Sequence, residues 1–277
     1  MLAAFDGWVD AASAATSAAE HLARGAELLA EFDGDVLFDY RSRRPVLDIV
    51  DGTLTRLEWP ALALHRTRVD RRDVLILHGA EPDFRWQELG DDILQLCLSL
   101  GVVEWVSVGA IPAAVPHTRP VPVLATASDE AELHHGETKG PPGLLRVPSA
   151  CLSSLEMAVA NAGIPAVGFF AQVPHYVGGP YAAASVSLLE HVGRHLGVEL
   201  PLGALAEDAV SQRNRLDAAV EADEDVRDIL QRMESSSDEA QEMPSGDDLA
   251  AEIERFLKDQ PDEGPAGPGG QGPFPGT

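Results

Sequence analysis

Short apolar segments that alternate with amphipathic ones constrain the fold of this chain more than any other feature of its sequence. Val74–His78 and Val102–Val108 are apolar runs that each end at a glycine, which is typical of strands buried on both faces of a sheet. Between them, Trp86–Leu100 has apolar residues at helical spacing and also ends before a glycine. A strand, a helix and a second strand in this order form the repeating unit of a parallel sheet. The sequence therefore predicts a three-layer α/β/α sandwich with a mostly parallel central sheet.

The same alternation extends over residues 1–220, which we expect to form the α/β/α core domain. Two strand-like runs within Thr53–Thr67 surround Trp59 and Pro60 and predict a hairpin, which would make the sheet mixed. The other predicted strands are Leu2–Phe5, Val36–Tyr40, Val121–Ala125 and Ala166–Phe170, and the other predicted helices are Ala11–Ala30, Ser149–Ala162, Tyr181–Leu196 and Leu202–Ala219.

Nearly half of the net charge of the chain lies beyond this core, in residues 221–277. With 45 acidic and 20 basic residues the net charge is −25, which argues against binding to nucleic acid or to an anionic membrane. We expect residues 221–260 to form an acidic helical extension, with a linker at 235–239 and a capped amphipathic helix at 245–257. Residues 261–277 are rich in proline and glycine, and we expect them to be disordered.

Cysteine usage and hydropathy bear on the compartment. Cys97 and Cys151 both lie in apolar helical patterns, so we expect buried thiols in a reducing, cytoplasmic environment. No basic region followed by an apolar run opens the sequence, so no signal peptide is predicted. The longest uncharged apolar stretch, residues 157–174, is broken by Asn161, Gly163 and Pro165, so no membrane span is predicted.

Three loops follow predicted strands at the edge where a parallel sheet binds ligands. The first carries His78, Glu81 and Arg85, which could form a small-anion pocket with Glu81 or His78 as acid or base. The alternative interpretation is a helix entry, in which Asp83 caps and Phe84 staples the helix at 86–100.

The other two loops supply the remaining candidates for such a cleft. The loop at 109–120 is stiffened by prolines and holds His117 and Arg119, which could present a basic edge or serve a subunit contact. The loop at 171–180 holds His175 and ends at Pro180, which also suits helix initiation. No dinucleotide-binding or P-loop motif accompanies these residues, so no cofactor is expected.

Other polar clusters favour structural roles. His134 and His135 lie near Glu130, Glu132 and Glu137, but without ligands at helical spacing, so we interpret the segment as a solvated loop and predict no metal site. No nucleophile elbow surrounds the serines at 149–154, where Ser149 is interpreted as a helix cap. His191 and His195 lie near a helix C-terminus, where a structural role suffices. No catalytic residues are assigned.

Several segments, in order, resemble the proteasome assembly chaperone 2 family. They are FDGWVDAASAATSAAEHL (5–22), DVLILHGAEPDFRW (73–86), VSVGAIPAAVPHTRPVPV (106–123), PSACLSSLEMAVANAGIP (148–165) and VPHYVGGPYAAASVSLLEHV (173–192). The resemblance covers residues 2–260 and is greatest to the actinobacterial branch, because of the helix pattern from Ser245 to Leu257.

The resemblance implies a phosphorylase/hydrolase-like fold, self-association as a trimer and help in assembling proteasome α-rings. Family members have a longer lead before the first strand, so we expect the natural start to lie upstream of Met1. Chaperones that dock on proteasome rings often end in a hydrophobic residue, tyrosine and any residue, whereas this chain ends at Phe274–Thr277 without that motif. The docking mode, and proteasome subunits as partners, therefore stay open.

These inferences predict a non-enzymatic assembly chaperone that forms a homo-oligomer. Aromatic side chains often dominate interfaces, and the candidate partner-binding residues, which would otherwise be core residues, are Trp8, Phe84, Trp86, Tyr176 and Tyr181. The alternative is a phosphorylase- or ligase-like enzyme acting on a small anion, with its cleft built from His78, Glu81, Arg85, His117, Arg119 and His175. A third hypothesis is that the acidic helices at 206–259 bind a basic partner.

Overall fold

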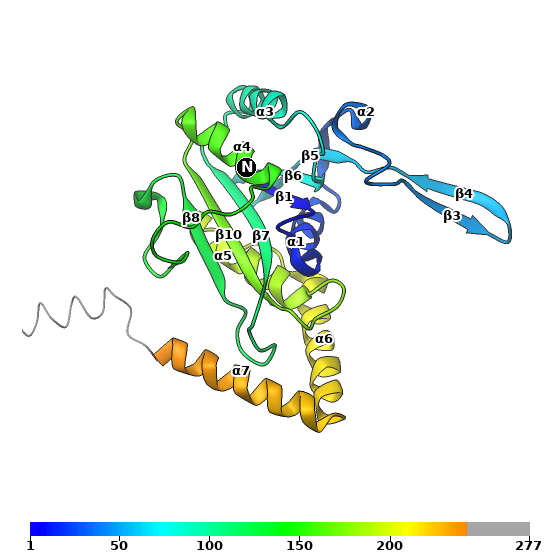
Figure 1. Ribbon diagram of the computed structural model, residues 1–277. Helices are drawn as coiled ribbons and strands as arrows, with labels where there is room; N and C mark the ends of the chain where they lie inside the picture. Colours follow the sequence, from blue (N-terminus) through cyan, green and yellow to red (C-terminus); the bar gives the residue numbers. More distant parts are fainter. Residues whose placement is uncertain (243–277) are drawn as a thin grey trace, which may run out of the picture. The chain divides into compact units, whose positions relative to one another are not determined.

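The computed structural model describes residues 1–242, with side chains up to residue 239. The chain divides into two compact units, Met1–Glu234 and Ser235–Thr277. The first unit holds the central sheet and the features that position the candidate sites (Figure 1).

Within the described residues the central sheet has eight strands in the order β2-β5-β6-β1-β7-β10-β8-β9. Strands β6, β1, β7 and β10 run parallel to one another. On one side β5 pairs antiparallel with β6, and β2 pairs antiparallel with β5. On the other side β8 pairs antiparallel with β10. The predicted mixed, mostly parallel sheet is therefore confirmed. The strands are β1 (Leu2–Asp6), β2 (Glu27–Glu31), β5 (Leu62–Val69), β6 (Arg72–Ala80), β7 (Trp105–Ala113), β8 (Val123–Ala127), β9 (Thr138–Lys139) and β10 (Ala166–Pro174).

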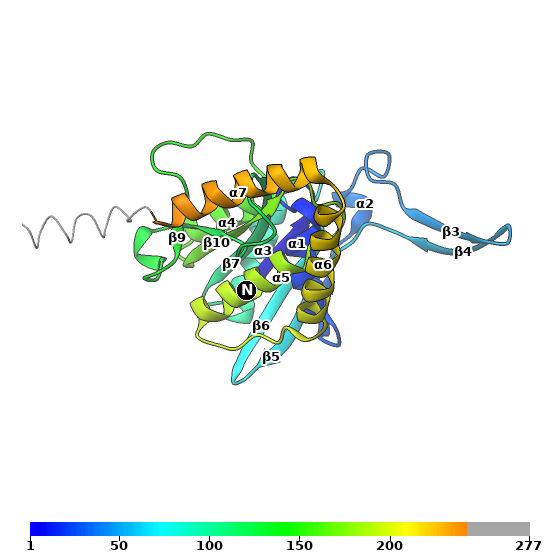
Figure 2. The same ribbon diagram turned by 90° about the horizontal axis from the view of Figure 1, so that it is seen from below.

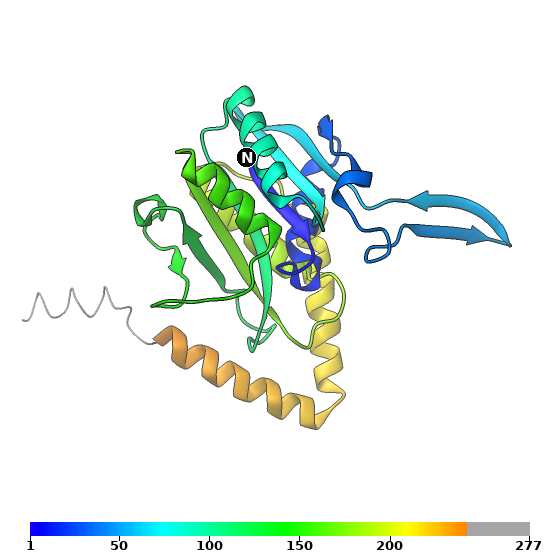
Figure 3. The same cartoon turned by 45° about the horizontal axis from the view of Figure 1, so that its top comes forward.

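Helices cover both faces of the sheet and complete the three layers. Helices α1 (Ala14–Ala23) and α5 (Ala182–Leu196) lie on one face, and α6 (Gly203–Glu221) packs on α5 (Figure 2). Helices α3 (Trp86–Leu100) and α4 (Cys151–Asn161) lie on the other face (Figure 3). Of the helices in the described part of the chain, none has both the length and the apolar character that a membrane span requires.

The pleat of the strands divides the buried side chains between two cores. Strand β7 directs Val106 and Val108 into the core under α1 and α5, and Trp105 into the core under α3 and α4. This alternation follows from the two-residue period of a strand. Both cysteines are free and buried in the second core, as their apolar settings predicted.

Helix α3 has the bounds that its sequence predicted. Leu89, Ile93 and Cys97 recur every four residues and bury one stripe, and Gly101 closes the helix with a φ of +67°. The predicted entry is wrong, because Arg85 occupies the N-cap position with no side-chain cap. The Asp83 carboxylate instead accepts a hydrogen bond from the backbone N–H of Asp39 at 2.8 Å.

The N-terminal third departs most from the sequence prediction. The helix predicted over Ala11–Ala30 ends at Ala23, and β2 follows as an edge strand after a left-handed turn at Gly25. The strand predicted over Val36–Tyr40 is wrong, because α2 (Gly34–Leu37) forms there. The Asp33 side chain caps this short helix by accepting from the backbone N–H of Asp35.

The hairpin predicted over Thr53–Thr67 contains two strands but pairs them wrongly. Strand β4 (Thr53–Glu58) pairs with β3 (Val46–Val50), which the sequence analysis did not identify, and β5 pairs with β6. Asp51 and Gly52, both at positive φ, form the β3–β4 turn.

Later elements differ mainly at their ends. Strands β7 and β10 run past the predicted stops, to Ala113 and Pro174, since they stay paired in parallel. Ser149 does not cap α4, because its hydroxyl donates to the carbonyl of Ala150. The linker predicted at 235–239 lies inside α7 (Glu224–Glu242). The helix predicted at 245–257 and the tail at 261–277 lie outside the described residues.

One glycine in β6 is required by a close approach of backbone. Gly79 has a φ of +142°, and a Cβ there would lie 2.1 Å from the carbonyl oxygen of Ala61. Both the backbone conformation and the contact therefore exclude a side chain.

We expect Gly79→Ala to lower the free energy of unfolding by about 2–5 kcal/mol, because backbone strain and overpacking add. Urea denaturation measures the loss. Gly163→Ala is the matched control: its φ is also positive, at +89°, but nothing lies within 4 Å of the added Cβ. The control loses only the left-handed cost of about 1–2 kcal/mol. Equal losses in the two variants would contradict the role of the contact with Ala61.

Candidate interaction surface

Strands β3 and β4 form a separate two-stranded ribbon, here called the arm, that extends away from the central sheet (Figure 1). All residues of both strands are exposed. Isolated two-stranded ribbons are marginally stable in water and gain stability when a face is covered. A surface that covers one face of the arm would therefore stabilise it.

The pairing register gives the arm one aliphatic face. Leu47 lies opposite Leu57, and Ile49 lies opposite Leu54, with an irregularity at Thr55 that keeps these four side chains on the same face. They are between 44% and 68% exposed. These four residues are called the arm face below. Contiguous exposed aliphatic side chains of this kind mark interaction sites on soluble proteins.

The opposite face of the ribbon is largely polar. It pairs Asp48 with Arg56 and Val50 with Thr53, and Arg56 forms an ion pair with Glu58 at 3.0 Å. The arm is thus amphipathic, and the arm face is the side that gains free energy from burial.

The base of the arm is tied to the centre of the sheet. The Arg43 guanidinium donates to both carboxylate oxygens of Asp6, the last residue of β1, at 2.6 Å each. Trp59, which follows β4 at the base of the arm and is half exposed, packs edge-on against Tyr40 with ring centroids 4.7 Å apart. These contacts anchor the arm at its base while the arm face stays open.

The arm and its flanks differ in charge from the rest of the chain. Residues 41–60 contain four arginines and three acidic residues, a net charge of +1, whereas the rest of the chain carries −26. An acidic partner surface is therefore not repelled by this region.

The residues of the predicted anion cleft do not share one cavity. His78 lines a pocket of about 640 Å³ at the base of the arm, together with Asp6 and Arg43. Arg85 lines a hollow of about 130 Å³ beside α3, where it pairs with Glu88. His117 and Arg119 line a hollow of about 250 Å³ between α5 and α6. These four candidate residues therefore line three separate hollows.

Glu81 has a structural position in place of the predicted catalytic one. One carboxylate oxygen accepts from the backbone N–H of Cys151 at 2.7 Å, at the first residue of α4. The other accepts from the backbone N–H of Trp8 at 3.3 Å. A carboxylate at a helix N-terminus satisfies unpaired N–H groups, so Glu81 supplies the cap that Ser149 does not.

His117 belongs to a buried network between the loop after β7 and helix α6. The Tyr176 hydroxyl lies 2.8 Å from His117 Nδ1 and accepts from the His117 backbone N–H at 2.8 Å. His117 Nε2 lies 3.2 Å from Asp217, which Arg213 also binds at 2.9 Å. Burial lowers the pKa of His117 against the opposing effect of Asp217. A neutral His117 ring can accept from the tyrosine hydroxyl at Nδ1 and donate to the aspartate at Nε2.

The remaining candidates differ in exposure. His175 is exposed, and its ring lies 3.3 Å from the carbonyl of Ala113. Trp8 is 66% exposed and Phe84 50%, and Tyr176 is partly exposed beside His117. These three residues follow β1, β6 and β10, whose carboxyl ends lie at one edge of the sheet.

Two predicted contact aromatics are less available. The indole N–H of Trp86 donates to the carbonyl of Pro82 at 2.6 Å, and this side chain is partly buried. Tyr181 is 3% exposed, and burial raises its pKa to about 12. A surface role for Tyr181 is therefore wrong, because the α5 entry packs its ring into the core.

The arm was not predicted from the sequence. The signal that could have identified it is the alternation in VLDIV (46–50) and TLTRLE (53–58). These two runs are separated by the Asp-Gly pair typical of a tight hairpin turn.

A family model described as PAC2 family matches residues 4–220. The chain belongs to the PAC2 family. Among solved structures, a proteasome-assembly chaperone homologue from Mycobacterium tuberculosis is 35% identical, with 83% of this chain and 98% of that chain covered and a TM-score of 0.75. The comparison with curated proteins gave no match.

Further solved structures extend this PAC2 relationship. A PAC2 family protein from Streptomyces avermitilis is 33% identical, covering 83% of this chain and 98% of that one with a TM-score of 0.74. An archaeal proteasome activator from Pyrococcus furiosus, at 17% identity and a TM-score of 0.61 over 79% and 91% of the chains, shares the fold. The predicted family and its actinobacterial character are thus confirmed.

One histidine at the arm base makes the stability of this PAC2 protein sensitive to acid. Burial, with the ring of His65 at 3.2 Å, lowers the pKa of His78 to about 4. Between pH 6.5 and 4 the unfolded chain binds a proton at His78 that the folded chain does not. The free energy of unfolding therefore falls with falling pH in this window.

We expect His78→Gln to remove this contribution. Urea denaturation at pH 7 and pH 5 measures the free energy of unfolding of both proteins, and the wild type should lose more on acidification. Histidines that do not contact His78 are present in both proteins and cancel in the comparison. Identical losses would contradict the pKa assigned to His78.

Proposed function

We propose that this PAC2 protein is a non-enzymatic assembly chaperone that works as a homo-oligomer joined through the arm. The observation that carries the proposal is the arm face, four aliphatic side chains held in register and exposed on a two-stranded ribbon. A ribbon of this kind gains its stability from the surface that covers it.

A second copy of the chain is the partner that best fits the arm. Residues 41–60 have a net charge of +1 and the rest of the chain −26, so the arm of one copy is not repelled by the acidic body of another. An arm that binds the body of the next copy makes a head-to-tail contact, which closes into a ring when the rotation permits. This geometry supports the trimer that the family resemblance implies.

The client surface that we propose is the rim at the carboxyl ends of the parallel strands. Trp8, Phe84 and Tyr176 lie at that edge and remain exposed. Exposed aromatic side chains of this type commonly anchor protein interfaces. Because a structure 35% identical is described as a proteasome-assembly chaperone homologue, we propose a proteasome subunit as the client, in the cytoplasm.

The enzyme alternative has no comparable support. Four of its residues, His78, Arg85, His117 and Arg119, line three separate hollows, and Glu81 accepts hydrogen bonds from two backbone N–H groups.

We expect Leu47→Asp combined with Leu57→Asp to dissociate the oligomer. Two buried charges at the interface cost several kcal/mol, which shifts a micromolar equilibrium by more than about 100-fold. Light scattering after size-exclusion chromatography, at 1–100 µM, measures the mass of both proteins.

Val210→Asp is the matched control, because Val210 is 63% exposed on α6, away from the arm, and undergoes the same change in chemistry. The control should keep the mass of the wild type. A wild type that is monomeric across this range would contradict the proposed homo-oligomer. An oligomer that the double variant leaves intact would contradict the role of the arm in joining it.

The client rim has its own test. We expect Trp8→Ala combined with Phe84→Ala to reduce capture of purified proteasome α-subunits at least about 10-fold, since aromatic anchors carry much of the energy of an interface. The mass of the oligomer should stay unchanged. Equal capture by variant and wild type, or no capture by the wild type, would contradict this client surface.

A further inference from the structure

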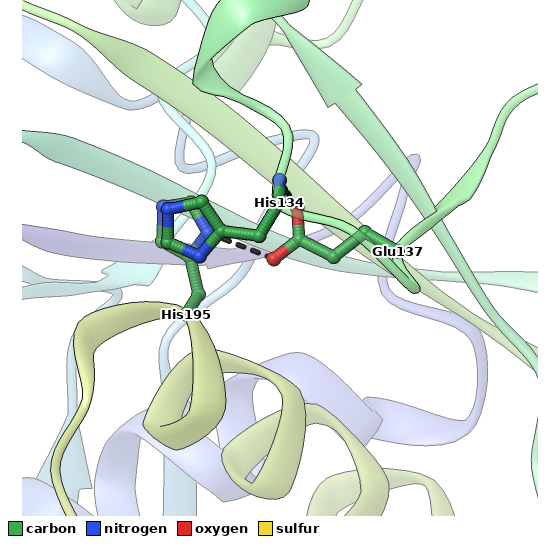
Figure 4. Close-up of side chains that lie close together, drawn as sticks. All are labelled: His134, Glu137 and His195. Atoms are coloured by element: carbon green, nitrogen blue, oxygen red, sulfur yellow. Dashed lines mark hydrogen bonds and ion pairs between the residues drawn. The ribbon is translucent and has the colours of Figure 1, made fainter.

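Three side chains from two distant segments meet at the edge of the sheet opposite the client rim. His195 lies in the last turn of α5, and His134 and Glu137 lie in the loop between β8 and β9 (Figure 4). One potential ligand atom from each lies within 4.8 Å of the others. His195 Nδ1 and a carboxylate oxygen of Glu137 are 2.8 Å apart.

A fourth residue holds the buried imidazole from its other side. His195 Nε2 lies 2.8 Å from a carboxylate oxygen of Glu104, which directly precedes β7. The His195 side chain is 1% exposed, and the ring of Phe169 packs edge-on against it at 5.4 Å. Metal-binding histidines typically donate their second ring N–H to a carboxylate, which fixes the ring and its tautomer. Glu104 has this relation to His195.

We propose that His134, Glu137 and His195 form a binding site for Zn²⁺, with Glu104 as the residue that positions His195. Two imidazole nitrogens and one carboxylate are a donor set that zinc uses, with a fourth position open to water or another ligand. The site lies within the one compact unit and is independent of the arm and the client rim.

The electrostatic setting favours a cation at this position. Two carboxylates, Glu104 and Glu137, converge on the same buried ring. The C-terminal end of α5 carries the negative end of the helix dipole next to His195. A divalent ion would neutralise the two carboxylates at once.

Binding requires one side chain to turn. The His134 and His195 rings are stacked, with centroids 4.3 Å apart and planes 22° apart, whereas a metal lies in the plane of each ring that binds it. His134 is exposed, so its ring can turn out of this stack into solvent, while His195 is held by Glu104 and Phe169. Zinc would thus draw the β8–β9 loop onto the end of α5 as a clip.

The test uses the full chain, stripped with EDTA and titrated with ZnCl₂ at pH 7.5 by calorimetry. We expect one zinc per chain and a rise in Tm, because a ligand that binds only the folded state stabilises it. Cobalt(II) should give the visible absorption of a four-coordinate site. His134→Ala should abolish the Tm rise and the cobalt spectrum.

His135→Ala is the matched control, because this adjacent histidine is also exposed but lies outside the cluster. It should bind zinc as the wild type does. Glu104→Gln should weaken binding about 10–100-fold, as expected for a carboxylate that positions a ligand.

Two outcomes would overturn the proposal. One is the absence of zinc binding to the wild type at 100 µM metal, which would leave a buried imidazole held by two carboxylates as the whole role of the cluster. The other is binding by His134→Ala with unchanged affinity. Circular dichroism of the His134→Ala variant, whose replaced side chain is exposed, separates a lost site from a lost fold.

Discussion

The short central strand β1 is the constraint on which the rest of the structure depends. All five of its residues pair with β6 on one side, Leu2 and Ala3 also pair with β7 on the other, and four of the five are buried. Its last residue, Asp6, then accepts from Arg43 below the arm and from the backbone N–H of Glu81 at 3.0 Å. The end of β1 therefore fixes the positions of the sheet, the arm and the loop before α3 relative to one another.

Polar side chains near the sheet edge mainly close gaps in the backbone. Asp10, which is 8% exposed, accepts from the backbone N–H of Ala15 at 2.7 Å and from the Thr16 hydroxyl at 2.5 Å, and burial raises its pKa. Glu81 does the same for α4. Ionisable residues in loops beside a parallel sheet resemble catalytic groups in a sequence, but here they replace caps that the helices lack.

The parallel strands and helix α3 could be predicted because local pattern and tertiary environment agree in them. Leu89, Ile93 and Cys97 bury one stripe, and a glycine ends the helix where the pattern ends. The arm was missed because its strands stand outside the sheet, so the pairing of β4 depends on β3 and not on the apolar run that follows it. The cluster at His195 brings together His195 and Glu137, which are 58 positions apart. A contact between such distant residues cannot be recognised from spacing in the sequence.

The exposed arm face bears on how assembly would depend on the concentration of the chain. In the homo-oligomer that we propose, the four aliphatic side chains of the arm face would be covered only on association, so ordering of the arm and assembly would be a single equilibrium. In a ring of several copies, the assembled amount then varies with a power of the chain concentration. The concentration of the chain would therefore set a threshold below which the arm face stays uncovered. Newly made chains would complete their folding only when they associate.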